Sequence, residues 1–220
     1  MATRSHPILQ GSPKSWFMTP YVPNQSVGEV DPYFVVEFFQ ELGNQWRFID
    51  VAGIVHHVDF NGLTTKPCVT NGWNALRNFY QWTEVHMLTL FYYGQNTFLM
   101  LTAPGELDTS DFPSFHSMST QLCHDHSYLV FINENNYNSS ELVLSRPFGH
   151  FLMAESTKSE FKLCGPLGHI VSCKLLIDLE FKLGEGWTTF CQLNNIQPGN
   201  HLTFNMHETL ENNVIIVKQM

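Results

Sequence analysis

Charged residues are scarce in this sequence. Asp, Glu, Lys and Arg make up only 14% of the 220 residues, against roughly a quarter in a typical soluble chain. The 20 Asp and Glu outnumber the 11 Lys and Arg, which gives a formal net charge of −9. A phosphate backbone repels such a chain on average, so net charge alone argues against nucleic acid as a partner.

Cysteine is also scarce, and its pattern excludes a disulfide scaffold. The odd number of thiols, spread over a long chain, favours a reducing compartment. The first residues, Met1 to Pro7, contain no apolar signal-peptide core, so secretion is not expected. The cysteines are Cys68, Cys123, Cys164, Cys173 and Cys191.

Apolar residues, in contrast, make up 43% of the chain and include 18 Phe. This composition excludes intrinsic disorder, a collagen-like repeat and a coiled coil, and it leaves a packed globular protein. The stretch from Val85 to Gly105 has no charged residue and approaches the length of a membrane span. Because Gly94-Gln95-Asn96 interrupts it with a turn signal, we expect a β-hairpin here and no membrane partner.

Most apolar runs are four to eight residues long and end at Gly, Pro, Asn or Asp. This rhythm is typical of short strands in a sandwich or barrel. The sequence therefore predicts a mainly β protein. The expected strands are 47–51, 54–60, 128–132, 141–144, 170–177, 201–204 and 213–217.

The two halves of the chain look like copies of one unit. Gly72-Trp73 and Gly186-Trp187 lie 114 residues apart, which a tandem duplication predicts. Several residues at equal distances after the two Trp are apolar in both halves, and the alignment of the two segments needs no gap. These pairs are Leu76 and Phe190, Trp82 and Ile196, Leu88 and Leu202, and Leu90 and Phe204.

The stretch between the halves, with Pro104-Gly-Glu-Leu-Asp-Thr-Ser-Asp, reads as a linker. We therefore expect four parts in the chain. They are an N-terminal tail at 1–13, a first domain at 14–104, a linker at 105–126 and a second domain at 127–220.

The ordered motifs resemble the plant-specific B3 DNA-binding domain, present twice. The second copy carries Gly186-Trp187-x-x-Phe190 followed by Asn194-x-Ile196-x-Pro198-Gly199. The first copy is divergent, with Leu76 in place of the Phe. The resemblance implies two tandem seven-stranded open β-barrels with short helices. It also implies a nuclear transcriptional regulator that inserts two arms into the major groove of double-stranded DNA.

By the family's pattern, the first arm is the loop 133–140, with Asn136 and Asn138, and Arg146 lies beyond it. The second arm lies between Lys174 and Lys182. Asn reads adenine edges, Arg reads guanine edges and Lys mostly neutralises phosphate. The resemblance therefore implies that DNA contact depends mainly on the second barrel and these five residues.

The charges support an alternative function. Asp178 and Glu180 lie in the second arm, where they would face phosphate. The first copy has still fewer basic residues and is the weaker candidate for DNA. The alternative is a degenerate module of the same fold that has lost DNA binding and contacts proteins, in particular through the first barrel.

Patterns for an enzyme are weak. Cys123-His124-Asp125-His126 lacks the Glu of a cupin-type metal site, and the set Cys164, His169, Cys173 and Cys191 matches no common zinc spacing. The sequence has no nucleophile elbow, phosphate loop or dinucleotide fingerprint. We therefore expect no catalysis, no metal site and no cofactor.

Overall fold

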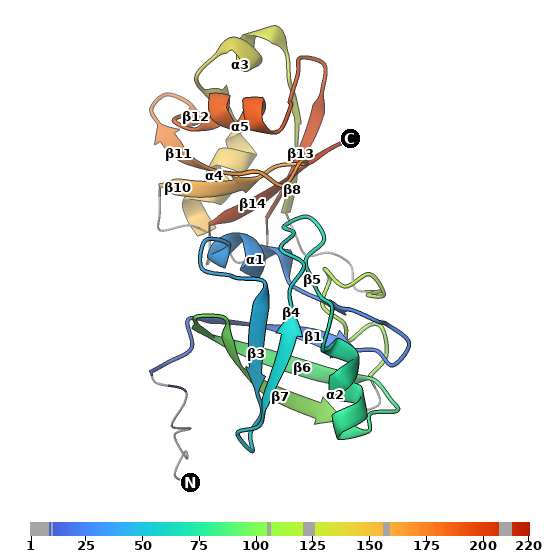
Figure 1. The fold of residues 1–220 in the computed structure, drawn as a ribbon. Helices are drawn as coiled ribbons and strands as arrows, with labels where there is room; N and C mark the ends of the chain where they lie inside the picture. The colour runs from blue at the N-terminus through green and yellow to red at the C-terminus, as the bar shows by residue number, and fades with distance from the viewer. Residues whose placement is uncertain (1–8, 10, 105–106, 121–125, 156–158, 207–212) are drawn as a thin grey trace. The chain divides into compact units, whose positions relative to one another are not determined.

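The computed structural model describes residues 9, 11–104, 107–120, 126–155, 159–206 and 213–220. The chain divides into two compact units, Met1–Cys123 and His124–Met220. Both units are built mainly from β-strands (Figure 1), which confirms the prediction of a mainly β protein. The sequence placed the start of the second domain at 127, close to this division.

The first unit contains a five-stranded sheet in the order β1-β6-β7-β3-β4, in which β3 and β7 run parallel. A second sheet pairs β2 with β5, and a bridge between Phe60 and Val69 extends β4 toward it. The elements are β1 (Ser15–Tyr21), β2 (Gly28–Glu29), α1 (Pro32–Phe38), β3 (Gln45–Ile49), β4 (Val55–Asp59), β5 (Cys68–Val69), α2 (Trp73–Tyr80), β6 (His86–Gly94) and β7 (Thr97–Pro104).

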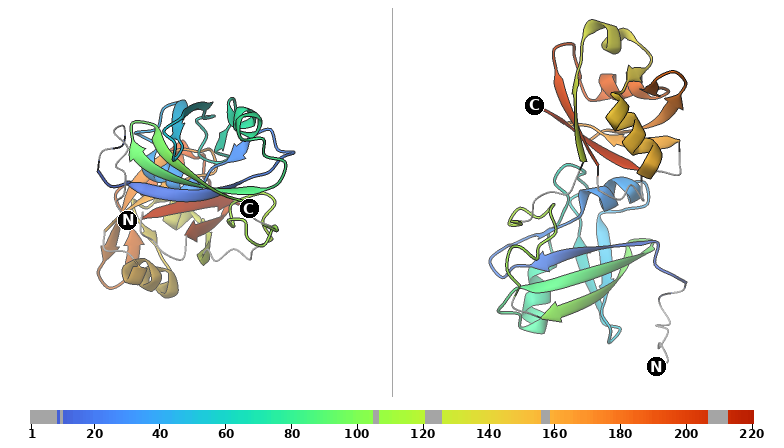
Figure 2. Two further views of the ribbon diagram at one scale, coloured as in Figure 1. Left: turned by 90° about the horizontal axis from the view of Figure 1, so that it is seen from below. Right: turned by 180° about the vertical axis from the view of Figure 1, so that it is seen from behind.

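The second unit has one curled seven-stranded sheet in the order β8-β13-β14-β10-β11-β12-β9, with β10 parallel to β14 (Figure 2). This order matches β1-β6-β7-β3-β4 followed by β5-β2 of the first unit. The barrel form of each unit stays a prediction. The elements are β8 (His126–Phe131), α3 (Glu134–Asn138), β9 (Leu142–Val143), α4 (Arg146–Glu155), β10 (Glu160–Cys164), β11 (Ile170–Ile177), β12 (Phe181–Leu183), α5 (Trp187–Leu193), β13 (His201–Met206) and β14 (Val214–Gln219).

The two Gly-Trp turns have the same geometry. Gly72 and Gly186 precede α2 and α5 with left-handed φ angles of 86° and 106°. A Cβ at Gly72 would lie 2.3 Å from the carbonyl oxygen of His57, and one at Gly186 would lie 2.1 Å from that of Ser172. Both the dihedral angle and the close approach therefore require glycine.

Each unit has its own hydrophobic core. Trp73 and Trp187 are fully buried in the two cores, and burial of large aromatic side chains is a dominant stabilising contribution. The four pairs of residues matched after each Trp in the sequence are also buried in both units. The internal repeat therefore extends from the sequence to the packing.

The uncharged stretch after Val85 forms the β6–β7 hairpin, as predicted, with Gln95 and Asn96 in left-handed conformations at the turn. In the part of the chain that the structure describes, no helix combines the length and the apolar character that a membrane crossing requires.

Two segments differ from the sequence-based expectation. The predicted loop 133–140 contains α3, because the side chain of Asn133 caps the backbone amide of Asn136. The predicted linker, over its described residues 107–120, packs on the first unit, where Phe112 is buried with Val22 and Met87. Phe112 supplies this anchor within a Ser-, Asp- and Pro-rich run.

Candidate nucleic-acid interface

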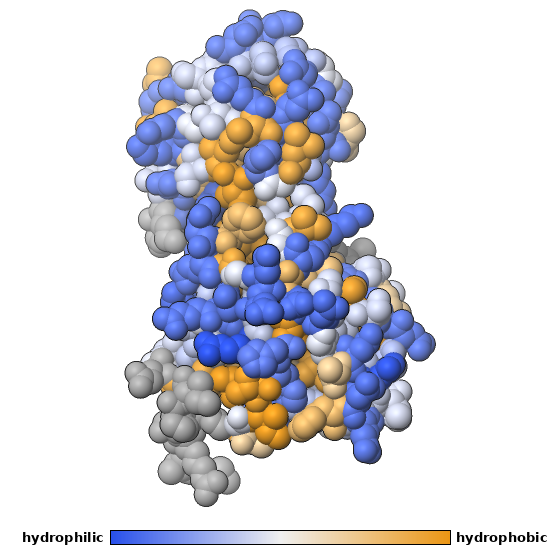
Figure 3. Space-filling view, viewed as in Figure 1, coloured by the Kyte–Doolittle hydropathy of each residue, from blue (hydrophilic) through white to orange (hydrophobic). Residues whose placement is uncertain are grey.

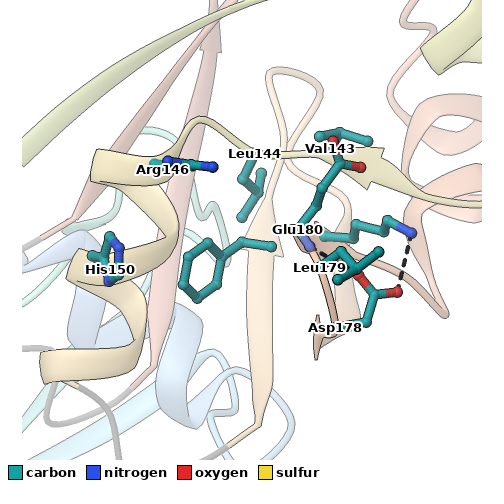
Figure 4. Close-up of a pocket in the computed structure, with 9 residues that line it drawn as sticks. Val143, Leu144, Arg146, His150, Asp178, Leu179 and Glu180 are labelled. Atoms are coloured by element: carbon teal, nitrogen blue, oxygen red, sulfur yellow. Dashed lines mark hydrogen bonds and ion pairs between the residues drawn. The ribbon is translucent and has the colours of Figure 1, made fainter.

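A recess of about 730 Å³ opens on the second unit between α4 and the turn that joins β11 to β12 (Figure 4). It brings together two of the five predicted DNA-contacting residues, Arg146 and Lys182, whereas Asn136, Asn138 and Lys174 do not line it. Its walls carry charges of both signs. The lining residues are Val143, Leu144, Arg146, His150, Asp178, Leu179, Glu180, Phe181 and Lys182.

The close packing of α4 against β12 forms one side of the recess. A Cβ at Gly149 would lie 2.1 Å from Cγ of Phe181, so only glycine permits this approach. Arg146 and His150 are four residues apart and therefore lie on the same face of the helix. The His150 ring meets the Phe181 ring edge-on at a centroid distance of 4.9 Å.

Lys182 is held by two acids. Its Nζ lies 3.3 Å from Oδ2 of Asp178 and 3.4 Å from Oε2 of Glu141. Hydrogen bonds to Asp178 and Glu141 raise the pKa of Lys182. Its charge is therefore largely compensated, which reduces its value as a phosphate contact.

Asp178 also organises the exposed β11–β12 turn. Its Oδ1 accepts a hydrogen bond from the backbone N–H of Glu180 at 2.9 Å. This bond and the bond from Lys182 lower the pKa of Asp178. The acid that seemed unfavourable for DNA therefore shapes the turn, whose tip displays Leu179 with 99% of its surface exposed.

Lys174 pairs with Glu185, the residue before Gly186. The hydrogen bond and the charge of Glu185 raise the pKa of Lys174. The first unit has a corresponding link with an uncharged donor, because Asn71, the residue before Gly72, donates to the Asp59 carboxylate at 2.9 Å. The repetition of this link indicates that Lys174 joins β11 to the Gly-Trp turn.

The two predicted asparagines also have local partners. Oδ1 of Asn136 accepts from the backbone N–H of Asn133 at 2.7 Å, and its Nδ2 donates to the carbonyl of Phe131 at 3.0 Å. Nδ2 of Asn138 lies 3.4 Å from Oε2 of Glu134. Reading an adenine edge needs both the amide donor and the acceptor, so Asn136 would have to leave its capping position to do it.

Arg146 differs from both lysines. It is exposed at the start of α4, and among the residues that the structure describes no acid lies within ion-pair distance of it. It is therefore the cation of the recess that is most available to an anionic ligand.

Sequence reasoning missed His150 and Phe181. The spacing of four residues from Arg146 signals His150 once 146–155 is known to be helical. The packing of Phe181 on Gly149 has no local signal, because it joins elements 32 residues apart.

The described residues contain no group of three or more metal-ligating side chains. Cys123, His124 and Asp125 of the first metal candidate lie outside the described residues. In the second candidate, burial raises the pKa of Cys173 and of Cys191 to about 12. Both side chains are part of the hydrophobic core of the second unit.

Comparisons with known proteins add little. No protein-family model matches the chain, and a search of curated proteins found no match. One solved structure that matches is that of a hypothetical Arabidopsis thaliana protein, with a TM-score of 0.37 and 20% identity. The match covers 43% of this chain and 94% of that chain. The family therefore stays a prediction that rests on residues of this sequence.

Proposed function

We propose that this protein is a nuclear transcriptional regulator of the plant B3 type. In this proposal it contains two tandem open barrels, and the second contacts the major groove of double-stranded DNA. The observation that carries the proposal is Arg146, which has no acid within ion-pair distance among the described residues and lines a recess beside the turn of the predicted second arm. An exposed Arg near a protruding turn is suited to a guanine edge or a phosphate.

The ion pairs limit the number of contacts. Lys174 and Lys182 are both compensated by acids, so Arg146 is the main cation offered to DNA. Each phosphate contact contributes a slope of about −0.9 to the dependence of log K on log salt for duplex DNA. We expect a shallow slope of about −1 to −2 and sequence selection through few bases.

The test is selection of duplexes from a random pool by the full chain, followed by fluorescence anisotropy of the enriched sequence across a salt series. Enrichment of one motif, with affinity that falls as salt rises, supports the proposal. A pool without enrichment, together with affinity independent of salt, would overturn it.

A specific observation favours the second candidate, a protein-interaction module. Hydrophobic side chains gather on the first unit over the ends of β3 and β4 (Figure 3). Val51, which is 71% exposed, Ile54 and Val55 form this surface at the turn between the two strands. Exposed apolar patches mark interaction sites, and this one lies in the copy with the fewest basic residues. If the random pool yields no enriched duplex, the protein-interaction module becomes the favoured function.

A further inference from the structure

Residues 107–120 of the first unit form a compact loop whose ends meet. The backbone N–H of Thr120 donates to the carbonyl of Thr109 at 3.0 Å, and His116 N–H donates to Pro113 at 2.9 Å. Such closed loops are packed by their own side chains and are frequently functional.

The loop has an apolar anchor and a polar anchor. Phe112, only 1% exposed, packs against Val22 and Met87. Five residues later, Ser117 donates from its backbone N–H to Oε2 of Glu29 at 2.8 Å and from its hydroxyl to Oε1. Together the two anchors fix both the body of the loop and its end.

His116 lies beside the polar anchor, but its ring makes no hydrogen bond to Glu29. Its side chain is fully buried, and its Nδ1 accepts from the backbone N–H of Met118 at 3.2 Å. In the neutral ring the proton is therefore on Nε2, which lies 3.7 Å from Oε1 of Glu29. Gln25 also donates to Glu29, at 3.3 Å. This carboxylate thus faces several hydrogen-bond donors.

The repeat identifies the surface that the loop occupies. Glu29 pairs with Cys68 in the β2–β5 ladder, as Val143 pairs with Lys182 in the β9–β12 ladder. Val143 and Lys182 line the recess of the second unit. The Glu29 contact therefore places this end of the loop, in the first unit, on the counterpart of one edge of the candidate interface.

The chemistry of the two surfaces differs. The first helical residues after β2 and β9 are Pro32 and Arg146, and Cys68 stands in the place of Lys182. At these positions the first unit therefore offers the Glu29 carboxylate and the Cys68 thiol, where the second unit has Val143 and the Lys182 cation.

We propose that this surface of the first unit is a peptide-binding site and that residues 107–120 occupy it as an internal ligand. The site takes a segment with an aromatic anchor followed, five residues on, by a hydroxyl donor and a backbone amide donor. While the loop is bound, the surface is closed to other chains. The inference concerns the first unit alone and holds whether or not the second unit binds DNA.

The test uses the full chain and a fluorescent synthetic peptide of residues 107–120. The variant Phe112→Ala/Ser117→Ala weakens the internal ligand, and we expect it to bind the peptide about tenfold or more tightly than wild type, since hydrogen bonds to a charged group are worth about 1.5–3 kcal/mol. Adding Glu29→Ala should abolish the gain. Adding Glu84→Gln should preserve it, because this exposed acid makes no side-chain hydrogen bond or ion pair with the described residues of the loop.

Hydrogen exchange of residues 107–120 reports release of the loop independently of peptide binding. Faster exchange in the double variant, with peptide binding that needs Glu29, supports the inference. Faster exchange without peptide binding, or unchanged exchange, overturns it. The single variant Ser117→Ala changes an exposed side chain and replaces the double variant in both measurements if that variant fails to fold.

Discussion

Tyr80 and Asn194 stand at the same position of the two units, at the end of the helix that follows each Gly-Trp turn, and each ties that helix to a hairpin. The Tyr80 hydroxyl donates to Oδ2 of Asp50 at 2.6 Å, after β3. The Asn194 amide donates to the carbonyl of His169 at 3.4 Å and accepts from Leu167 N–H at 3.3 Å, between β10 and β11. Different side chains thus make the same connection.

Removing the Tyr80 hydroxyl should destabilise the first unit. Burial opposes the charge of Asp50, but hydrogen bonds from Tyr80 and from the amides of Ile54 and Ala52 outweigh it and lower the pKa of Asp50. We expect Tyr80→Phe to cost about 1.5–3 kcal/mol of unfolding free energy, measured by urea denaturation at pH 7. Because the lowered pKa stabilises the fold only while Asp50 is ionised, the difference should shrink as the pH falls through that pKa.

Tyr93→Phe is the matched control for this experiment. It removes a hydroxyl with no hydrogen-bond partner among the described residues. Equal losses for the two variants would contradict the connection proposed for Tyr80.

Gly149→Ala should destabilise the second unit, although Ala normally favours a helix interior over Gly by about 1 kcal/mol. The new Cβ would lie 2.1 Å from Phe181, and overpacking costs about 1–3 kcal/mol. In a Phe181→Ala background the same substitution should become neutral or stabilising, as measured by a double-mutant cycle in urea. Additive losses would show that α4 and β12 do not constrain each other.

The loop over Glu29 should loosen in acid. Burial lowers the pKa of His116, and the charge of Glu29 opposes that shift only in part. His116 therefore takes up a proton less readily in the bound loop than in the released loop. The stability that neutral His116 gives the bound loop is complete above the ordinary His pKa of about 6.5 and declines as the pH falls below it. Hydrogen exchange of residues 107–120 should therefore rise between about pH 7 and pH 5, once intrinsic exchange rates are corrected for.

The groups that face His116 are the Glu29 carboxylate, the Phe112 ring and, beside Glu29, the Cys68 thiol. His116→Gln should flatten the pH dependence. His86→Gln, at a half-buried histidine outside the loop, should leave it as in wild type. A slope that survives in His116→Gln would assign the effect to another group.

Lys174→Ala should leave DNA affinity at the wild-type level, because Lys174 joins β11 to Glu185 and its charge is already compensated. Fluorescence anisotropy on the selected duplex measures this. A loss of affinity that Glu185→Ala does not share would return Lys174 to the DNA interface.

The internal repeat could be predicted from the sequence, but the contacts between its elements could not. Gly72 and Gly186 signalled their turns because their conformation needs glycine locally, and Gly94-Gln95-Asn96 signalled the β6–β7 hairpin in the same way. The helix α4 was hidden, because its Arg146-Pro-Phe-Gly start resembles an extended segment. The Ser117–Glu29 bond joins residues 88 apart, and no local pattern encodes such a partner.

The sequence also predicted only part of the candidate interface. Arg146 was found through the family resemblance and lines the recess. The sequence did not show which acids form ion pairs with Lys174 and Lys182, because such pairing depends on strand register. The side chain of Asn136 was assigned to DNA, but its local geometry uses it as a helix cap.

The measurement that tests the central claim most directly is the salt-dependent affinity of Arg146→Ala for the selected duplex, compared with Lys218→Ala, an exposed cation of the same unit outside the recess. We expect Arg146→Ala to lose about 1–3 kcal/mol of binding free energy and about one unit of salt slope, with Lys218→Ala close to wild type. Equal affinities and equal slopes for the two variants would contradict DNA binding at this recess.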